Sequence, residues 1–165
     1  MFKYVILAIV VVCIIIFLLL RDKKPVSANA EIFIQAPLDR VWIILTDIQK
    51  WKNWNSDIES MNVIGDVELG TTFIWKAGGV TIESEITELI PKQKIAWKGK
   101  TTGISAYHIW NFSEEEKNVR VYTEERFSGI LAWLLPGTMR NQISKALKHG
   151  VLVLKQEAEK ESTKP

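Results

Sequence analysis

The chain has 165 residues, of which 47% are hydrophobic, and its 21 Lys and Arg residues nearly balance its 19 Asp and Glu residues. This length suits one domain of ordinary size, and the single cysteine excludes a disulfide framework and a zinc site built on cysteines. The small positive charge lies near the N-terminus, so the rest of the chain lacks the basic surface typical of nucleic-acid-binding proteins, and we expect no nucleic-acid partner.

The first twenty residues are almost uninterruptedly apolar. Tyr4 to Leu20 form a run of 17 apolar or aromatic residues, with Lys3 before it and a charged cluster at 21–24 behind it. A helix of roughly 17–20 residues, at about 1.5 Å each, just spans a hydrocarbon core of about 30 Å. We therefore expect one transmembrane helix at residues 1–21, in a single-pass membrane protein, and a connector at residues 22–29.

A cleavable signal peptide is the alternative interpretation of this segment. Ala28-Asn29-Ala30 matches the A-x-A pattern and supports cleavage after Ala30. However, the apolar run is longer than that of a typical signal peptide, and the charged cluster resembles a stop-transfer flank. More basic residues follow the run than precede it, so the positive-inside rule favours a cytoplasmic rather than an exported domain.

Residues 30–160 are predicted to form an α+β domain, and residues 161–165 a tail. A strand at Glu31–Ala36 leads into a helix that begins near Pro37, and an amphipathic helix at Thr138–Lys160 closes the domain. Turn residues separate the strand-like runs between them, so we expect an antiparallel sheet that covers one side of the last helix. The runs are Ile58–Ile64, Thr71–Lys76, Val80–Ile90, Lys94–Lys100, Ile104–Ser113 and Asn118–Ser128.

Alternation along the strands places a few polar residues on the inward, mostly apolar face. If Ser113 faces Asn118 across the last hairpin, His108 lies opposite Thr123 and one diagonal step from Glu125. Such a pair can orient the polar end of a ligand, act as acid and base, or complete a core network, and these alternatives stay open. His108 and Glu125 are thus the weak catalytic candidates. The inward polar residues are Ser84, His108, Thr123 and Glu125.

All seven tryptophans lie beyond residue 41, and several share the inward face of the predicted sheet. Large rings beside a few polar groups are typical of the wall of a ligand pocket, although each ring alone also fits a plain core. We expect no metal site and no cofactor. The predicted cavity residues are Trp54, Trp75, Ser84, Trp97, His108, Trp110, Thr123, Glu125 and Phe127.

An apolar stretch, Gly129–Pro136, connects the last strand to the last helix. It is either a buried connector or a gate at the mouth of the cavity that touches lipid. In the second interpretation, Leu131, Trp133 and Leu134 are the gate or membrane contact.

The residues resemble those of the SRPBCC or START-like superfamily, and within it the polyketide cyclase/dehydrase-like branch. The resemblance implies a helix-grip fold, a curved antiparallel sheet of about seven strands around the C-terminal helix, which encloses a hydrophobic cavity. Members of the family bind lipids, sterols, polyketides or quinones, and some are enzymes without a shared catalytic signature. The matching segments, within residues 29–160, are AEIFIQAPLDRVWIILTDIQKWKNWNSDI, LGTTFIWKAGG, ITELIPKQKIAWKGK, AYHIWNFS and HGVLVLKQEAEK.

Three functions therefore compete. The first is a membrane-anchored binding module for a hydrophobic small molecule such as a lipid, a quinone or a polyketide-like compound. The second is a cyclase, dehydratase or hydrolase that uses His108 and Glu125, although no Ser-His-Asp, HExxH, P-loop or GxGxxG motif supports an enzyme. The third is a membrane-tethered interaction domain without a ligand. The expected partners are an apolar small molecule and membrane lipid.

Overall fold

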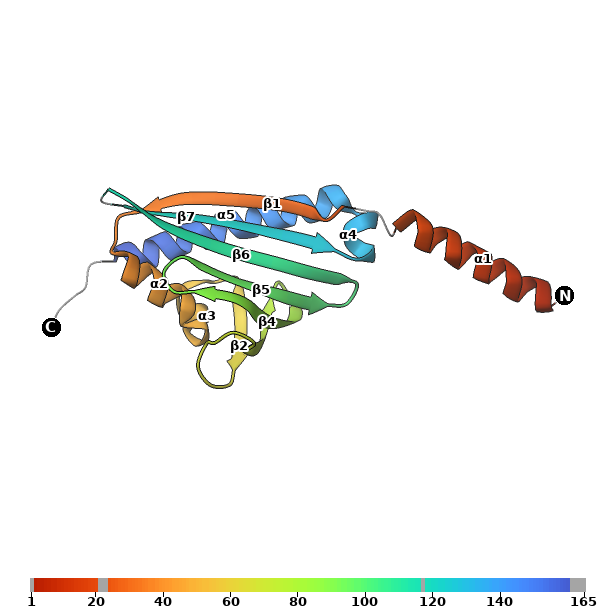
Figure 1. Cartoon of the computed structure of the whole chain (residues 1–165), viewed down its shortest axis with the longest axis horizontal. Coiled ribbons are helices and arrows are strands. Elements are labelled where there is room, and N and C mark those ends of the chain that lie inside the picture. Colours follow the sequence, from red (N-terminus) through yellow and green to blue (C-terminus); the bar gives the residue numbers. More distant parts are fainter. Residues whose placement is uncertain (1, 21–23, 117, 161–165) are drawn as a thin grey trace.

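The computed structural model of the chain describes residues 2–20, 24–116 and 118–160, with the side chains of residues 16–20 left out. The predicted tail at 161–165 and most of the charged cluster at 21–24 lie outside these residues. The first helix, α1 (Phe2–Leu20), projects from the rest of the chain in Figure 1. Over the described residues, no helix combines the length and the apolar character that crossing a membrane requires.

Seven antiparallel strands form one sheet in the order β1-β7-β6-β5-β4-β3-β2. The chain runs through β2 to β7 as a simple meander, and β1 closes the sheet by pairing with β7. The α+β class, the seven-stranded antiparallel sheet and the long C-terminal helix are thereby confirmed. The strands are β1 (Val26–Ile34), β2 (Ile58–Val63), β3 (Thr72–Ala77), β4 (Val80–Ile90), β5 (Lys94–Thr101), β6 (Ile104–Glu115) and β7 (Asn118–Ser128).

The long helix α5 (Pro136–Glu159) packs along one side of the sheet, behind β1 and β7 in Figure 1. Its inner face is apolar at helical spacing, which is the reason it stays on the sheet. Three short elements link β1 to β2, namely α2 (Leu38–Thr46), a 3₁₀ turn (Ile48–Lys50) and α3 (Trp51–Trp54). The buried residues of α5 are Met139, Ile143, Leu147, Gly150, Val151, Leu154 and Ala158.

The first strand begins at Val26, earlier than the predicted strand at Glu31–Ala36. Residues 26–29, predicted to belong to a connector, pair with β7, and Val26 itself lies opposite Phe127. Both Val26 and Ala30 are buried. Cleavage after Ala30 would therefore remove the first half of an integral strand together with two core side chains.

The hairpin of β6 and β7 is longer than the sequence predicts. Glu115 rather than Ser113 pairs with Asn118. The expected register is therefore wrong, and the partner of each residue differs from the expected one by two positions. His108 consequently lies directly opposite Glu125, and Thr123 lies opposite Trp110. Because side chains alternate with a period of two, an error of two residues changes the partners and leaves every side chain on its predicted face.

A short helix, α4 (Ile130–Leu134), follows β7 and occupies the predicted apolar connector. Gly129 joins the two elements with a φ of +110°, and a β-carbon there would lie 2.5 Å from the carbonyl oxygen of Gly103. Only glycine fits this conformation and this approach. The backbone N–H of Leu131 donates to the same Gly103 oxygen at 3.3 Å, so α4 is held against the β5–β6 turn.

Candidate functional site

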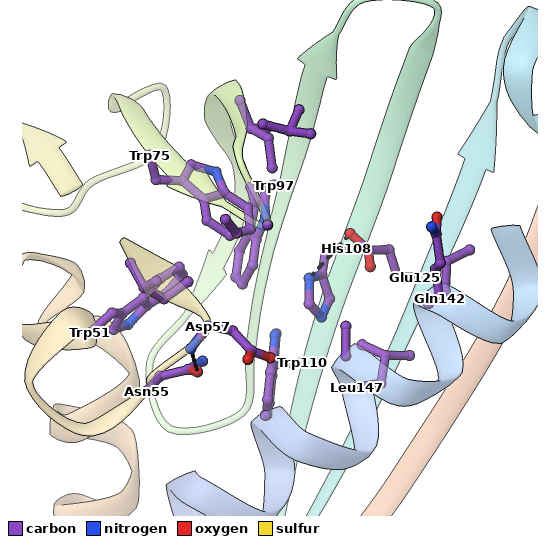
Figure 2. Close-up of a pocket in the computed structure, with 18 of the residues that line it drawn as sticks. Trp51, Asn55, Asp57, Trp75, Trp97, His108, Trp110, Glu125, Gln142 and Leu147 are labelled. Atoms are coloured by element: carbon purple, nitrogen blue, oxygen red, sulfur yellow. Dashed lines mark hydrogen bonds and ion pairs between the residues drawn. The ribbon is translucent and has the colours of Figure 1, made fainter. Parts of the chain in front are cut away.

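A cavity of about 430 Å³ lies between the sheet and α5, and Figure 2 shows the side chains that line it. Most of its wall is apolar or aromatic, as in typical pockets for small organic molecules. Ser84 and Thr123 are behind the wall rather than part of it, and each hydrogen-bonds to a lining residue. The predicted residues that do line the cavity are Trp54, Trp75, Trp97, His108, Trp110, Glu125 and Phe127.

Trp51 organises the aromatic end of the cavity. It meets Phe73 and Trp75 edge-on, with ring centroids 6.0 and 6.2 Å apart, and lies 5.4 Å from Trp97. Its indole N–H donates to the carbonyl of Leu45 at 2.8 Å, which fixes the ring in the wall. We did not predict Trp51 as a site residue, since the short turn before it carries no periodic signal.

His108 has a defined tautomer because its neighbours fix where the proton sits. The Thr123 hydroxyl donates to the carbonyl of Ile109 at 2.9 Å, so its oxygen receives a proton from the imidazole. The Nε2 of His108, 2.8 Å away, is that donor. Nδ1 therefore carries a lone pair, and it has no hydrogen-bond partner within residues 2–20, 24–116 and 118–160, although His108 is only 8% exposed.

Glu125 faces this unpaired nitrogen. Its Oε1 lies 3.6 Å from Nδ1 of His108, beyond hydrogen-bond length, and both side chains are only about a tenth exposed. Burial raises the pKa of Glu125 to about 8 and lowers the pKa of His108 to about 3. At neutral pH the pair is therefore a mostly protonated carboxyl beside a neutral imidazole, not an ion pair.

The mouth of the cavity is polar. Asn55 and Asp57, just after α3, line the cavity together with Gln142 on α5, and the hydrogen bond from the backbone N–H of Asp57 to the Asn55 side chain is drawn in Figure 2. His149 lies beside this rim, with Nε2 3.3 Å from Ser56 Oγ and 3.7 Å from the Asp57 carboxylate. These polar residues lie outside the regular strands, so strand alternation gave no means of finding them. Among the described residues, no cluster of His, Cys, Asp and Glu could hold a metal.

The predicted gate residues do not line this cavity. Leu131, Trp133 and Leu134 belong to α4, which covers the end of the sheet beside the β5–β6 turn. Leu134 is 64% exposed and Leu131 is 38% exposed, so α4 presents apolar side chains to the outside of the domain. The contact with lipid therefore stays a prediction.

The family described as "Polyketide cyclase / dehydrase and lipid transport" matches residues 25–159. The chain belongs to this family. The match begins one residue before β1 and ends at the last residue of α5, so the family domain is the sheet with its helices. The predicted resemblance to the polyketide cyclase/dehydrase-like branch is thus confirmed.

Solved structures share the fold of this polyketide cyclase/dehydrase family member. A hypothetical protein from Helicobacter pylori has a TM-score of 0.73 at 20% identity, over 81% of this chain and 88% of that one. The Zhui aromatase/cyclase from Streptomyces has a TM-score of 0.63 at 15% identity, over 81% and 93%. A START superfamily protein from Mycobacterium smegmatis has a TM-score of 0.68 at 10% identity, over 81% of this chain and 97% of that one. No curated protein matches the sequence.

Proposed function

We propose that this family member is a membrane-anchored binding module for a hydrophobic small molecule, such as a lipid, a quinone or a polyketide-like compound. The observation that carries the proposal is the cavity of about 430 Å³, with its aromatic wall and its neutral polar pair. Pockets of roughly 300–1,000 Å³ suit organic ligands of ordinary size. A module without a ligand would be expected to fill this space with its own side chains.

The membrane anchor in this proposal is α1. Its large apolar side chains from Phe2 to Ile15 are 45% to 80% exposed, and none of them belongs to the described hydrophobic core of the domain. An apolar surface of this extent calls for a partner, and a bilayer matches a helix that is apolar on all sides. The excess of basic residues after the helix favours a domain on the cytoplasmic side.

The geometry of the domain supports an orientation towards the bilayer. The chain enters the sheet at Val26, which pairs with Phe127, and α4 begins three residues later, at Ile130. The anchor and α4 therefore meet the domain at the same end, as Figure 1 shows. Ile130, Leu134 and Leu135, all exposed, would then lie next to the headgroups and contact lipid.

An acid–base enzyme is the second candidate, and the raised pKa of Glu125 inside a cavity is the observation that favours it. However, a His108 with a pKa of about 3 is a poor base at neutral pH. The carboxyl of Glu125 would have to act as the acid without an activated base beside it. Binding is therefore the function that the site supports better.

Binding can be tested with the neutral fluorescent probe N-phenyl-1-naphthylamine and the full chain in lipid nanodiscs, with empty nanodiscs as the blank. A β-carbon at Gly150 would lie at an ordinary contact distance of 3.7 Å from the Trp110 ring, and the longer side chain of Gly150→Leu would take space from the cavity. Gly137→Leu, on the same helix but facing open space, is the matched control. We expect saturable binding that Gly150→Leu weakens by about tenfold or more. Equal binding by all three chains would contradict the proposal.

The anchor is tested separately by fractionation. We expect the full chain to float with vesicles in a density gradient and to resist extraction by alkaline carbonate. A chain without residues 2–20 is expected to be released from vesicles by alkaline carbonate. A full chain that carbonate releases would contradict a membrane-spanning anchor.

A further inference from the structure

Three polar atoms in the cavity wall are buried and have no hydrogen-bond partner among the described residues. Buried polar atoms are almost always paired, so each unpaired atom needs an explanation. Two are indole donors and one is an imidazole acceptor. The atoms are Nε1 of Trp54, Nε1 of Trp110 and Nδ1 of His108.

The acceptor is the most specific of the three. Because Nε2 of His108 is committed to Thr123, Nδ1 can only accept, and no group in the described part of the chain donates to it. The ring is held between Trp97 and Trp110, with centroids 4.6 and 5.5 Å away, so it cannot turn to find another partner. A ligand that satisfies this atom must bring a hydrogen-bond donor.

The charges of the cavity set a second requirement. The charged residues in its wall are Asp57 and Glu125, and the described lining holds neither Lys nor Arg. A carboxylate or a phosphate inside would therefore meet acidic groups and no counter-charge. The ligand group that reaches His108 is thus not an anion, and a cation would find no charged partner in the neutral His108–Glu125 pair.

We propose that the ligand is a neutral apolar molecule with a hydroxyl group, an alcohol or a phenol, that donates to Nδ1 of His108 and accepts from the carboxyl of Glu125. The proposal rests on the binding function above and deepens it. One oxygen atom can lie at hydrogen-bond distance from both groups, since Nδ1 and Oε1 are 3.6 Å apart. A second ligand oxygen would satisfy the indole N–H of Trp110, whose ring stacks on His108.

This inference separates candidate ligands that the cavity shape alone does not. A quinone has only acceptor oxygens and would leave Nδ1 unpaired, whereas the corresponding quinol or another phenol would pair it. A fatty acid or a phospholipid head would bring a negative charge. The order of preference is therefore hydroxyl, then ether or carbonyl, then carboxylate.

The test compares 2-naphthol, 2-methoxynaphthalene and 2-naphthoate by calorimetry on the full chain in nanodiscs, corrected for partition into empty nanodiscs. The three probes share a ring and differ in the donor and the charge. We expect 2-naphthol to bind about tenfold more tightly than the methoxy compound, because only the hydroxyl pairs Nδ1. His108→Phe should remove this preference, so that 2-naphthol and the methoxy compound bind this variant with similar affinities. Glu83→Gln, at an exposed position of β4, is the control.

The outcomes distinguish this inference from the function on which it rests. If 2-naphthol and the methoxy compound bind equally well, or if 2-naphthoate binds best, the hydroxyl proposal is overturned and the binding function stands. If none of the probes nor N-phenyl-1-naphthylamine binds, both are overturned.

A spectroscopic test needs no variant and covers the case in which His108→Phe fails to fold. Histidine ¹⁵N NMR is expected to show the Nε2–H tautomer for His108. Adding 2-naphthol should shift the Nδ1 resonance of His108, and the methoxy compound should not. The second histidine of the chain, His149, serves as the internal reference. A protonated Nδ1, or a resonance that 2-naphthol leaves in place, would overturn the proposal.

Discussion

His108 and Glu125 face each other across the β6–β7 pair, with 3.6 Å between Nδ1 and Oε1, and each side chain is only about a tenth exposed. This relationship makes the stability of the domain depend on pH. Burial raises the pKa of Glu125 from 4.5 to about 8, so the folded state binds this proton more tightly than the unfolded state does. That contribution is present below pH 4.5 and is lost as the pH rises through 8.

Glu125→Gln should remove the loss of folding stability that the natural chain shows as the pH rises through 8. We expect the variant to gain at least about 1 kcal/mol of stability relative to the natural chain between pH 5 and pH 9. Urea unfolding followed by tryptophan fluorescence at several pH values measures it, with Glu83→Gln as the control. Parallel pH profiles for the natural chain and Glu125→Gln would show that the carboxyl is not buried in this way.

At acid pH, the stability of the folded domain depends on His108, and here stability falls as the pH falls. Its pKa falls from 6.5 to about 3 on burial, so its contribution is present above pH 6.5 and is lost as the pH falls through 3. His108→Gln is expected to flatten the stability profile between pH 6.5 and pH 3. Urea unfolding at several pH values measures this, and a His108→Gln profile parallel to that of the natural chain would contradict the burial of a neutral imidazole.

The facing pair shows what the sequence could predict and what it could not. Alternation placed His108 and Glu125 on the inner face, and this inference tolerates an error of two residues in register. The partner of each residue depends on where the hairpin turns, and the polar run after Ser113 does not reveal that β6 continues to Glu115. The face was therefore predictable and the direct opposition was not.

Two other features depend on contacts that are distant in sequence. Residues 26–29 are mostly small or polar, so the sequence predicts a linker there. They form a strand because they pair with β7, about 100 residues later in the chain. Trp51 stands in a succession of short turns without helical periodicity, and only the packing of Phe73, Trp75 and Trp97 around it reveals its place in the cavity wall.

The hydroxyl of Thr123 should matter for stability as well as for the tautomer of His108. Thr123 is fully buried and links the imidazole to the carbonyl of Ile109. Thr123→Val keeps the shape of the side chain and leaves the buried Nε2–H of His108 without its acceptor, at a cost of about 1–3 kcal/mol. Thr81→Val, on the exposed side of β4, is the matched control and should change stability little. A Thr123→Val chain as stable as the control would contradict the hydrogen-bond chain.

Gly129 should resist substitution in a way that a second glycine does not. Gly129→Ala forces a β-carbon to 2.5 Å from a backbone oxygen at a φ of +110°, and we expect it to cost about 3 kcal/mol or more. Gly137→Ala, in α5 with open space around it, should be neutral or stabilising by up to about 1 kcal/mol. Urea denaturation compares the two, and a Gly129→Ala chain that unfolds at the same urea concentration as the natural chain would refute the close approach.

Truncation before and within β1 distinguishes an uncleaved anchor from a leader that is cleaved after Ala30. A chain that begins at residue 24 keeps all of β1 and is expected to fold. A chain that begins at residue 31 lacks Val26 and Ala30 from the core and half of the pairing with β7, so we expect it to be destabilised by several kcal/mol, on the order of 4 or more. Circular dichroism and thermal unfolding measure both. Equal stability of the two chains would restore cleavage after Ala30 as a compatible alternative.

The exposed side of α4 should bind lipid in the absence of the anchor. With the chain that begins at residue 24, we expect weak co-sedimentation with vesicles of neutral and anionic lipid, because Ile130, Leu134 and Leu135 offer apolar area to the interface. Leu134→Ser removes the apolar area that this side chain would bury in the lipid interface. We expect it to reduce vesicle binding about 5-fold. Leu152→Ser is the control, since Leu152 is 46% exposed but lies in α5 rather than at the anchored end. If Leu134→Ser and Leu152→Ser weaken vesicle binding equally, the contact of the domain with lipid is nonspecific and α4 does not face the membrane.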